Sequence, residues 1–241
     1  MIRSLANIDI KNIMAFDIET VRVVDDYEYL SDELKIAWAY KNKVDKNMPT
    51  DEQLSELWKG KDSAVNAEFA KVCAVSIAAI DKDDHLSCVE IYGPDEEDIL
   101  RKVSDIFIKK SSSTRRIVGH ASEFFDIPFL LKRMIINNIT LPALLDVGDA
   151  KPWERTNLDT FNLWKLGGST SCSLVALCAS LGIPLSKGDL TGAHVDESYF
   201  AGEYERIGRY CSHDTVATFN AICRLKGFPM YSFDDVNYVN I

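Results

Sequence analysis

Three strand-like segments, the last two of them adjacent in sequence, come before a helix–strand–helix series in this chain, and that order restricts the fold more than any other feature. Residues 11–20 (KNIMAFDIET) form a short apolar run of the kind found in buried strands. Two further apolar runs, 71–80 and 85–92, are separated by four charged residues, which predicts a β-hairpin. A helical pattern from about residue 95, a strand over 115–120 and a second helix follow. Because a hairpin pairs its strands antiparallel whereas a strand–helix–strand unit pairs them parallel, we predict an α/β protein with a partly antiparallel sheet.

Residues 25–70 differ in character from the strands on either side. They contain many charges and no strand pattern, but they carry helix-start signals: Ser31 before an apolar run, and Thr50 with Gln53 at the spacing of a capping box. A length of 241 residues is compatible with one large domain, at about 150 residues per domain. We therefore predict a single domain over residues 1–241, with 25–70 as a helical insertion between the first two strands.

The charge balance limits how the chain could bind a polyanion. The 37 acidic residues outnumber the 27 Lys and Arg, and the net charge of −10 disfavours a broad basic surface for nucleic acid. A site that recruits cations is compatible with this balance. No apolar stretch approaches the roughly 20 residues of a membrane-spanning helix, and the N-terminal segment lacks the features of a signal peptide. The six cysteines include no C-x-x-C pair, so we expect reduced thiols and a cytoplasmic protein.

Two carboxylates lie near the end of the first predicted strand. Asp17 and Glu19 are two residues apart, so they project from the same face of a strand, with Cα atoms roughly 6–7 Å apart. Two carboxylates that converge from an apolar strand are costly to leave unpaired, and a divalent cation such as Mg²⁺ would compensate them. A solvated strand end is the alternative, because the D-x-E pattern often arises by chance.

Two further acidic positions lie next to helices. Asp126 follows a predicted strand and opens an apolar helix, where it would either cap the helix or lie at a strand–helix junction of the kind that collects α/β active sites. Tyr210 and Asp214 are four residues apart in a predicted long helix over 202–226, so they share one face. An Asp in the middle of a helix needs a partner, and a buried Tyr–Asp hydrogen bond would be a purely structural explanation.

In this order, the carboxylates and Tyr210 resemble the three exonuclease motifs of the DEDD superfamily. A Tyr four residues before the last Asp is the mark of the tyrosine subtype, DEDDy. The stretch FDIPFLLKR (125–133) is similar to motif II in the proofreading domain of family-B DNA polymerases, and LDTFNLWKLGG (158–168) resembles the stand-alone polymerase-B-like predicted 3′–5′ exonucleases. The resemblance spans about residues 12–226. It implies the ribonuclease H-like exonuclease fold, with a central mixed sheet of about five strands flanked by helices.

The resemblance also implies an activity. That activity is metal-dependent 3′–5′ exonucleolytic hydrolysis of phosphodiester bonds at DNA 3′ ends, which releases nucleoside 5′-monophosphates with the help of two divalent ions, Mg²⁺ or Mn²⁺. By motif, Asp17 would bridge both ions, and Asp126 would hold one of them mainly through water. Glu19 and Asp214 would complete the other ion on the nucleophile side, and Tyr210 would orient the attacking water.

Substrate contacts are expected at three positions. Phe124, close to Asp126, could stack a terminal base, and Thr20 and Lys187 are further candidates for contact with nucleic acid. The expected partners are single-stranded or frayed 3′ ends of DNA. RNA trimming is the alternative with the same chemistry, and a nucleic-acid-binding module that keeps the fold without strong catalysis is the alternative of a different class. One departure bears on nucleotide positioning: the family usually has Asn five residues before the motif-II Asp, where this chain has Ala121.

Overall fold

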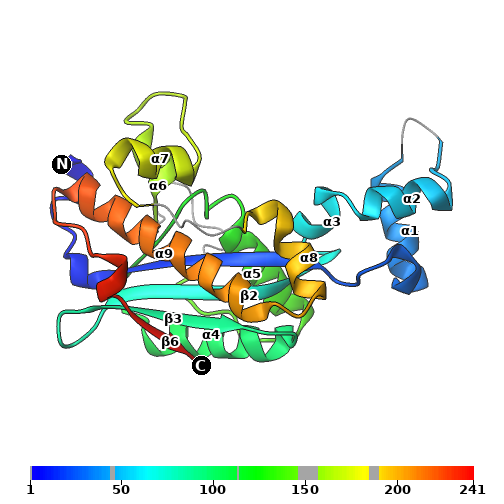
Figure 1. Cartoon of the computed structure of the whole chain (residues 1–241), viewed down its shortest axis with the longest axis horizontal. Helices are drawn as coiled ribbons and strands as arrows, with labels where there is room; N and C mark the ends of the chain where they lie inside the picture. Colours follow the sequence, from blue (N-terminus) through cyan, green and yellow to red (C-terminus); the bar gives the residue numbers. More distant parts are fainter. Residues whose placement is uncertain (1, 44–46, 113, 146–156, 185–189) are drawn as a thin grey trace.

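A central sheet of six strands is the frame of the protein, as the computed structural model shows (Figure 1). The structure describes residues 2–43, 47–112, 114–145, 157–184 and 190–241. The strands, in the spatial order β5-β4-β1-β2-β3-β6, are β1 (Ile13–Arg22), β2 (Ala70–Ile80), β3 (Leu86–Tyr92), β4 (Arg116–Gly119), β5 (Leu158–Asp159) and β6 (Asn237–Asn240).

The sheet is mixed. β1, β2 and β3 pair antiparallel, whereas β4 joins β1, β5 joins β4 and β6 joins β3 in parallel. The predicted α/β class, the hairpin and the mixed sheet are therefore confirmed, with six strands where about five were expected. The two strands that no pattern indicated, β5 and β6, have two and four residues, which is too short to show the strand period.

Helices cover both faces of the sheet (Figure 1). α4 and α5 pack on one face, where Phe16 of β1 shares a core with Phe107 and Leu130. α9 packs on the other face, where Ala15 of β1 shares a core with Phe219. None of the helices in the described ranges is long and apolar enough to cross a membrane. The α-helices are α1 (Asp32–Lys41), α2 (Asp51–Trp58), α3 (Lys61–Val65), α4 (Glu96–Lys109), α5 (Asp126–Ile136), α6 (Thr160–Trp164), α7 (Leu174–Leu181), α8 (Val195–Phe200) and α9 (Tyr204–Lys226).

The chain between β1 and β2 forms α1, α2 and α3, which project from one end of the sheet (Figure 1). The capping box predicted at Thr50 is present, since its hydroxyl accepts from the N–H of Gln53 and its own N–H donates to the Gln53 side chain. These helices enclose a small core in which the rings of Trp38 and Trp58 meet edge to face at 5.2 Å and Phe69 packs against both. Buried aromatic packing of this kind gives the insertion a defined shape.

One edge of β1 is open along most of its length. β2 pairs with β1 from Met14 to Arg22, whereas β4 pairs only with Ile13, Met14 and Ala15. Beyond Ala15, side chains and helices approach this edge in place of a strand: Asp126 of α5 contacts the backbone of β1, and α3 contacts the side chain of Thr20. A sheet edge without a strand partner leaves backbone groups that other parts of the chain can reach.

Candidate active site

Asp17 and Glu19 occupy alternate positions of β1 on the side of α9. The intervening Ile18 points into the core beneath α4 and α5, so the period of the strand places both carboxylates on the opposite face. Three potential ligand atoms lie within 4.8 Å of one another, one each from Asp17, Glu19 and Cys211 of α9. Asp17 and Glu19 are both partly exposed. A β-bulge between Glu19 and Thr20 interrupts the pairing of β1 with β2 at this point. Bulges are common next to active sites, where they re-aim a side chain.

Asp126 is the first residue of α5 and does not act as its N-cap. The N-cap position belongs to Phe125, which makes no side-chain capping bond, so the capping explanation is wrong. The Asp126 carboxylate is instead buried, with the residue 6% exposed, and its Oδ1 accepts a hydrogen bond of 3.3 Å from the backbone N–H of Ile18. The open edge of β1 makes this contact possible. It brings Asp126 to the backbone between Asp17 and Glu19.

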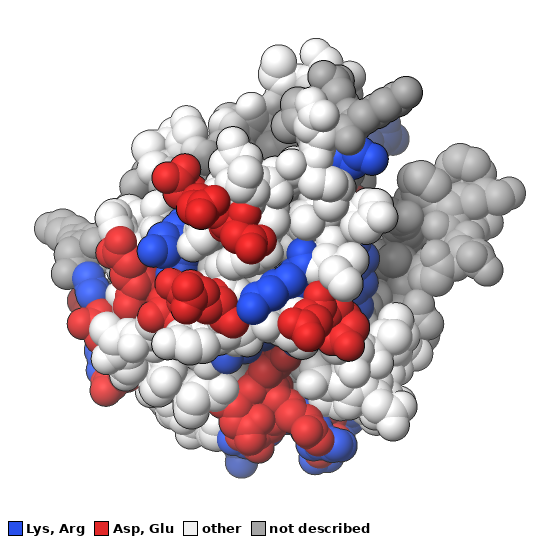
Figure 2. Space-filling view, turned by 90° about the vertical axis from the view of Figure 1, so that its right-hand side faces the viewer, with Lys and Arg blue, Asp and Glu red and all other residues white. Residues whose placement is uncertain are grey.

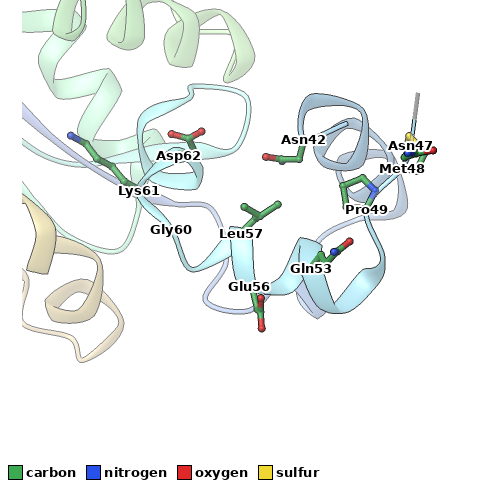
Figure 3. A pocket seen from close by; sticks show the side chains of 10 residues that line it. All are labelled: Asn42, Asn47, Met48, Pro49, Gln53, Glu56, Leu57, Gly60, Lys61 and Asp62. Atoms are coloured by element: carbon green, nitrogen blue, oxygen red, sulfur yellow. The ribbon is translucent and has the colours of Figure 1, made fainter. Parts of the chain in front are cut away.

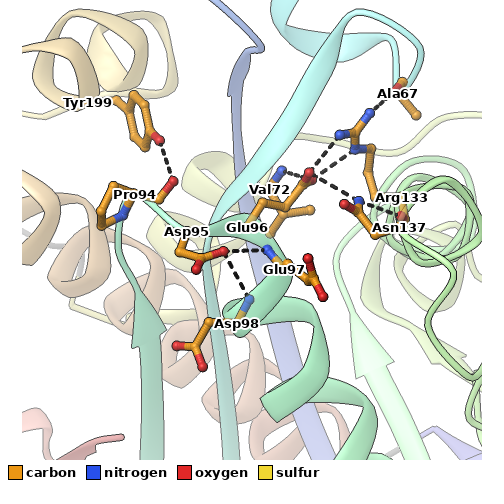
Figure 4. Close-up of polar contacts among 10 residues, drawn as sticks. All are labelled: Ala67, Val72, Pro94, Asp95, Glu96, Glu97, Asp98, Arg133, Asn137 and Tyr199. Carbon is orange, nitrogen blue, oxygen red and sulfur yellow. Dashed lines mark hydrogen bonds and ion pairs between the residues drawn. The ribbon is translucent and has the colours of Figure 1, made fainter.

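A buried ion pair holds the helix that carries Asp126 (Figure 4). The side chains of Arg133 on α5 and Glu96 on α4 are each 9% exposed, and their charged groups meet at 2.6 Å. Glu96 also accepts from the backbone N–H of Val72 in β2, and Arg133 donates to the carbonyl of Ala67 at the end of the insertion, both at 2.8 Å. Because these bonds join two helices, a strand and the insertion, they fix the position of α5 in the fold.

Tyr210 and Asp214 lie one turn apart on α9, and both are partly exposed. Burial raises the pKa of Asp214 to about 6, and the neighbouring Tyr210 hydroxyl partly offsets this by lowering that pKa. Between them, Cys211 packs on β1 with its Sγ 3.4 Å from the carbonyl oxygen of Asp17. α9 therefore presents the Tyr–Asp pair beside the acidic part of β1.

Burial raises the pKa values of all four carboxylates, and repulsion from the other carboxylates adds to this effect at Asp17 and Glu19. Burial is the largest cause for Asp17, whose pKa lies well above its ordinary value, and the other three carboxylates raise it further. The pKa of Glu19 is likewise raised well above its ordinary value, first by burial and then by Asp214 and Asp126. Burial raises the pKa of Asp126 to about 7. Among the described residues, no Lys or Arg forms an ion pair with any of the four. Four acidic groups from three distant segments thus meet without a basic partner.

This set of donors fits hard divalent cations. Mg²⁺ and Mn²⁺ prefer carboxylate oxygens, and a divalent charge would offset the repulsion that raises these pKa values. The neighbouring thiol is a weak ligand here, because burial raises the pKa of Cys211 well above its ordinary value and keeps the sulfur protonated. All six cysteines of the chain are free thiols. The candidate metal ligands are therefore Asp17, Glu19, Asp126 and Asp214.

A fifth acidic residue, Asp159 of β5, was not singled out from the sequence. It is 3% exposed, and its carboxylate accepts from the backbone N–H groups of Ala121 (3.0 Å), Glu123 (3.1 Å) and Phe161 (2.9 Å). Asp159 therefore holds the loop that leads from β4 to Asp126. Ala121 in this loop has φ of +61°, a left-handed conformation that Asn adopts more readily than Ala. The only sequence signal for Asp159 was its position as an N-cap of α6, which is a common arrangement.

The three expected substrate contacts have different environments. Phe124 is 65% exposed, and its ring lies 6.3 Å from that of Phe161, edge to face. The hydroxyl of Thr20 donates to the carbonyl of Ala64 at 2.7 Å, so it is engaged within the protein. Lys187 lies outside the described residues.

Comparisons with known proteins point in one direction. A family model described as a predicted 3′–5′ exonuclease related to the exonuclease domain of PolB matches residues 63–240, which include Asp126, Tyr210 and Asp214. Among solved structures, the chain is similar to the family B DNA polymerase of the hyperthermophilic archaeon Pyrobaculum calidifontis, with a TM-score of 0.56 and 18% sequence identity. The similarity covers 88% of this chain and 24% of the polymerase chain, and at this identity it concerns the fold, which is ribonuclease H-like. A search of curated proteins found no match.

Proposed function

This chain belongs to the family of predicted 3′–5′ exonucleases related to the exonuclease domain of PolB, and from that premise we propose that it is a metal-dependent 3′–5′ exonuclease that acts on DNA. The observation that carries the proposal is the meeting of four carboxylates with no basic partner among the described residues. A site that had lost its activity would be expected to have lost one of these groups. We take the whole chain as one exonuclease domain that includes the insertion.

The side chains have distinct proposed roles. Asp17 and Glu19 from β1, Asp126 from α5 and Asp214 from α9 would hold the metal. Two bound Mg²⁺ or Mn²⁺ ions would supply the positive charge that activates water and stabilises the leaving oxygen. The Tyr210 hydroxyl, one turn from Asp214, would orient the attacking water. A new O–P bond forms, the bond from phosphorus to the 3′ oxygen breaks, and that oxygen takes up a proton. The product is a nucleoside 5′-monophosphate.

We propose single-stranded or frayed 3′ ends as the substrate. Phe124 supports this, because its exposed ring lies two residues before Asp126, where a terminal unpaired base could stack on it. A paired end would have to fray before its last base could reach such a ring. RNA ends remain the alternative substrate, because no residue of the site reports on a 2′-hydroxyl.

A digestion assay tests the proposal. Oligonucleotides labelled at the 5′ end, as single-stranded DNA, duplex DNA and RNA of one sequence, are incubated with Mg²⁺, with Mn²⁺ or with a chelator. The Asp17→Ala variant removes a proposed ligand, and Asp105→Ala, which removes an exposed carboxylate of α4 that pairs with Lys109, is the matched control. We expect a ladder shortened from the 3′ end, and 5′-monophosphates, for the unaltered protein and for the control.

Each result has a defined meaning. Digestion of single-stranded DNA that stops with the chelator and in Asp17→Ala supports the proposal. Faster digestion of RNA replaces the DNA assignment with the RNA one. Binding of DNA without any digestion under either metal refutes catalysis and favours a binding module. Full activity in Asp17→Ala removes that residue from the reaction.

A further inference from the structure

A cleft connects the carboxylate site to the helical insertion. Its volume is about 610 Å³, and Glu19 and Thr20 of β1 line one side of it. The segment Lys59–Lys61, which joins α2 to the start of α3, lines another side. Gly192 and Ala193 before α8, with the acidic Asp196 and Glu197 of α8, line a further part of the wall. A chain that enters the carboxylate site through this cleft passes the insertion.

Two lysines in this cleft have no partner within the described structure. Lys59 and Lys61 are exposed, and neither side chain forms an ion pair or hydrogen bond with a described residue. The third cation of the cleft, Arg22, is already neutralised, since it pairs with Asp25 at 3.1 Å and with Asp196 at 3.0 Å. Lys61 also lines a neighbouring pocket of the insertion, and its amine extends away from Asn42 and Leu57 on the other side of that pocket (Figure 3). Among the described residues that line the cleft, the two lysines are therefore the cations that remain available to an anion.

The backbone that carries these lysines is anchored to β1. The Ser63 Oγ lies 2.6 Å from the carbonyl oxygen of Trp58 and 2.8 Å from that of Gly60, so its single proton is shared between the two carbonyls and closes the turn between α2 and α3. The Thr20 hydroxyl donates to the carbonyl of Ala64 and ties α3 to the residue next to Glu19. These hydrogen bonds fix the backbone of Lys59 and Lys61 relative to Glu19, because one of them is made by Thr20, the next residue in β1.

Basic groups are sparse on this end of the molecule. Figure 2 views the end that carries the insertion, and its Lys and Arg side chains lie singly between larger acidic groups. The chain as a whole has a net charge of −10. A polyanion is therefore attracted only at the few positions that carry a basic side chain. Two unpaired lysines in the cleft beside the site should contribute a larger share of the binding free energy than they would on a basic protein.

We infer that the Lys59–Lys61 segment binds two phosphates of the substrate strand and so makes the insertion a strand-positioning element. This inference rests on the proposed exonuclease function. The lysines would act on binding and not on the reacting atoms, so the double substitution K59A/K61A raises KM and leaves kcat unchanged. For a single strand, loss of two phosphate contacts makes the negative slope of log K against log salt shallower by about 1.4. Between roughly 50 and 200 mM salt, the affinity of the unaltered protein should therefore fall about sevenfold more than that of the variant.

The experiment measures binding and turnover separately. Fluorescence anisotropy of a labelled single-stranded oligonucleotide in Ca²⁺ gives the affinity and its salt slope, and a gel checks that the oligonucleotide stays intact. Digestion in Mg²⁺ gives KM and kcat. K59R/K61R keeps both charges and should restore affinity and slope. K82A/K110A removes the same charge from exposed lysines in the β2–β3 turn and at the end of α4, at the opposite end of the sheet (Figure 1), and should match the unaltered protein.

The outcomes distinguish this inference from the function on which it rests. If the unaltered protein neither binds nor digests an oligonucleotide, the exonuclease proposal itself fails. If it digests and K59A/K61A has the same KM and salt slope, the strand-positioning role is overturned while the enzyme stands. An equal change in K82A/K110A also overturns it, because the effect would then come from net charge. A fall in kcat alone would assign the lysines to another role.

Discussion

Replacement of Asp126 by Asn should stabilise the metal-free protein at alkaline pH while it removes a proposed metal ligand. Asn keeps an oxygen that can accept the hydrogen bond from the Ile18 N–H, but it carries no charge. The pKa of Asp126 is raised from 3.8 to about 7, chiefly by burial. A difference of about 3 pKa units corresponds to about 4 kcal/mol as an upper limit. About 2 kcal/mol is expected once the neighbouring carboxylates redistribute their protons.

The sign of the effect depends on pH. A carboxyl whose pKa is raised by folding contributes no penalty below its unfolded pKa, near pH 4, because it is protonated in both states. The penalty grows as the pH rises and is complete above about pH 7. Asp126→Asn should therefore raise Tm by roughly 4–8 °C near pH 8 and have little effect near pH 4.

Thermal unfolding followed by circular dichroism, with a chelator present, measures this difference across the pH range. Excess Mg²⁺ should then raise the Tm of the unaltered protein near pH 8 more than that of Asp126→Asn, because ligand binding stabilises only the state that binds it. The exposed Asp105→Asn on α4 is the matched control and should change Tm little at any pH. A lower Tm for Asp126→Asn by the same amount at acid and alkaline pH would refute the electrostatic reasoning.

Three further substitutions test the surroundings of the site. Asp159→Asn should cost about 2–3 kcal/mol in urea unfolding, because its amide cannot accept all three backbone N–H bonds, and unchanged stability would contradict the role of Asp159 in the loop before Asp126. Ala121→Asn should gain about 0.5–1 kcal/mol by the same measurement, since Asn tolerates the left-handed backbone, and a loss would show that the surroundings reject the larger side chain. Tyr210→Phe should lower kcat roughly 100-fold if the hydroxyl orients the water. It should also move the acidic limb of the pH–rate profile upward, because the hydroxyl lowers the pKa of Asp214; an unaltered profile and rate would exclude both effects.

Local patterns in the sequence were sufficient for much of the framework. Charged residues between two apolar runs predicted the hairpin of β2 and β3, and the Thr50–Gln53 spacing predicted the capping box of α2. The predicted end of the last long helix is confirmed at Gly227, which adopts φ of +77° as a left-handed helix end requires. Such signals act over a few residues, so they can be identified without knowledge of the rest of the chain.

Short elements and solitary polar residues escaped prediction. β5 and β6 are too short to show a period, and α6 and α8 have five and six residues. Asp159 has no neighbour in the sequence that reveals its three bonds, two of which join it to backbone N–H groups 36 and 38 residues away. A single Asp before a short helix is indistinguishable from an ordinary N-cap.

The sequence by itself determined the types of residue at the proposed site and the face that each occupies on its own element, because strand and helix periods depend only on spacing. Tertiary structure alone decided that Asp126 reaches the backbone of Ile18, 108 residues away, instead of capping its helix. That contact exists because β4 stops pairing after Ala15 and leaves the edge of β1 open. The raised pKa values and the cleft shared with the insertion also depend on which segments pack together, and the free energy of packing is a property of the whole chain.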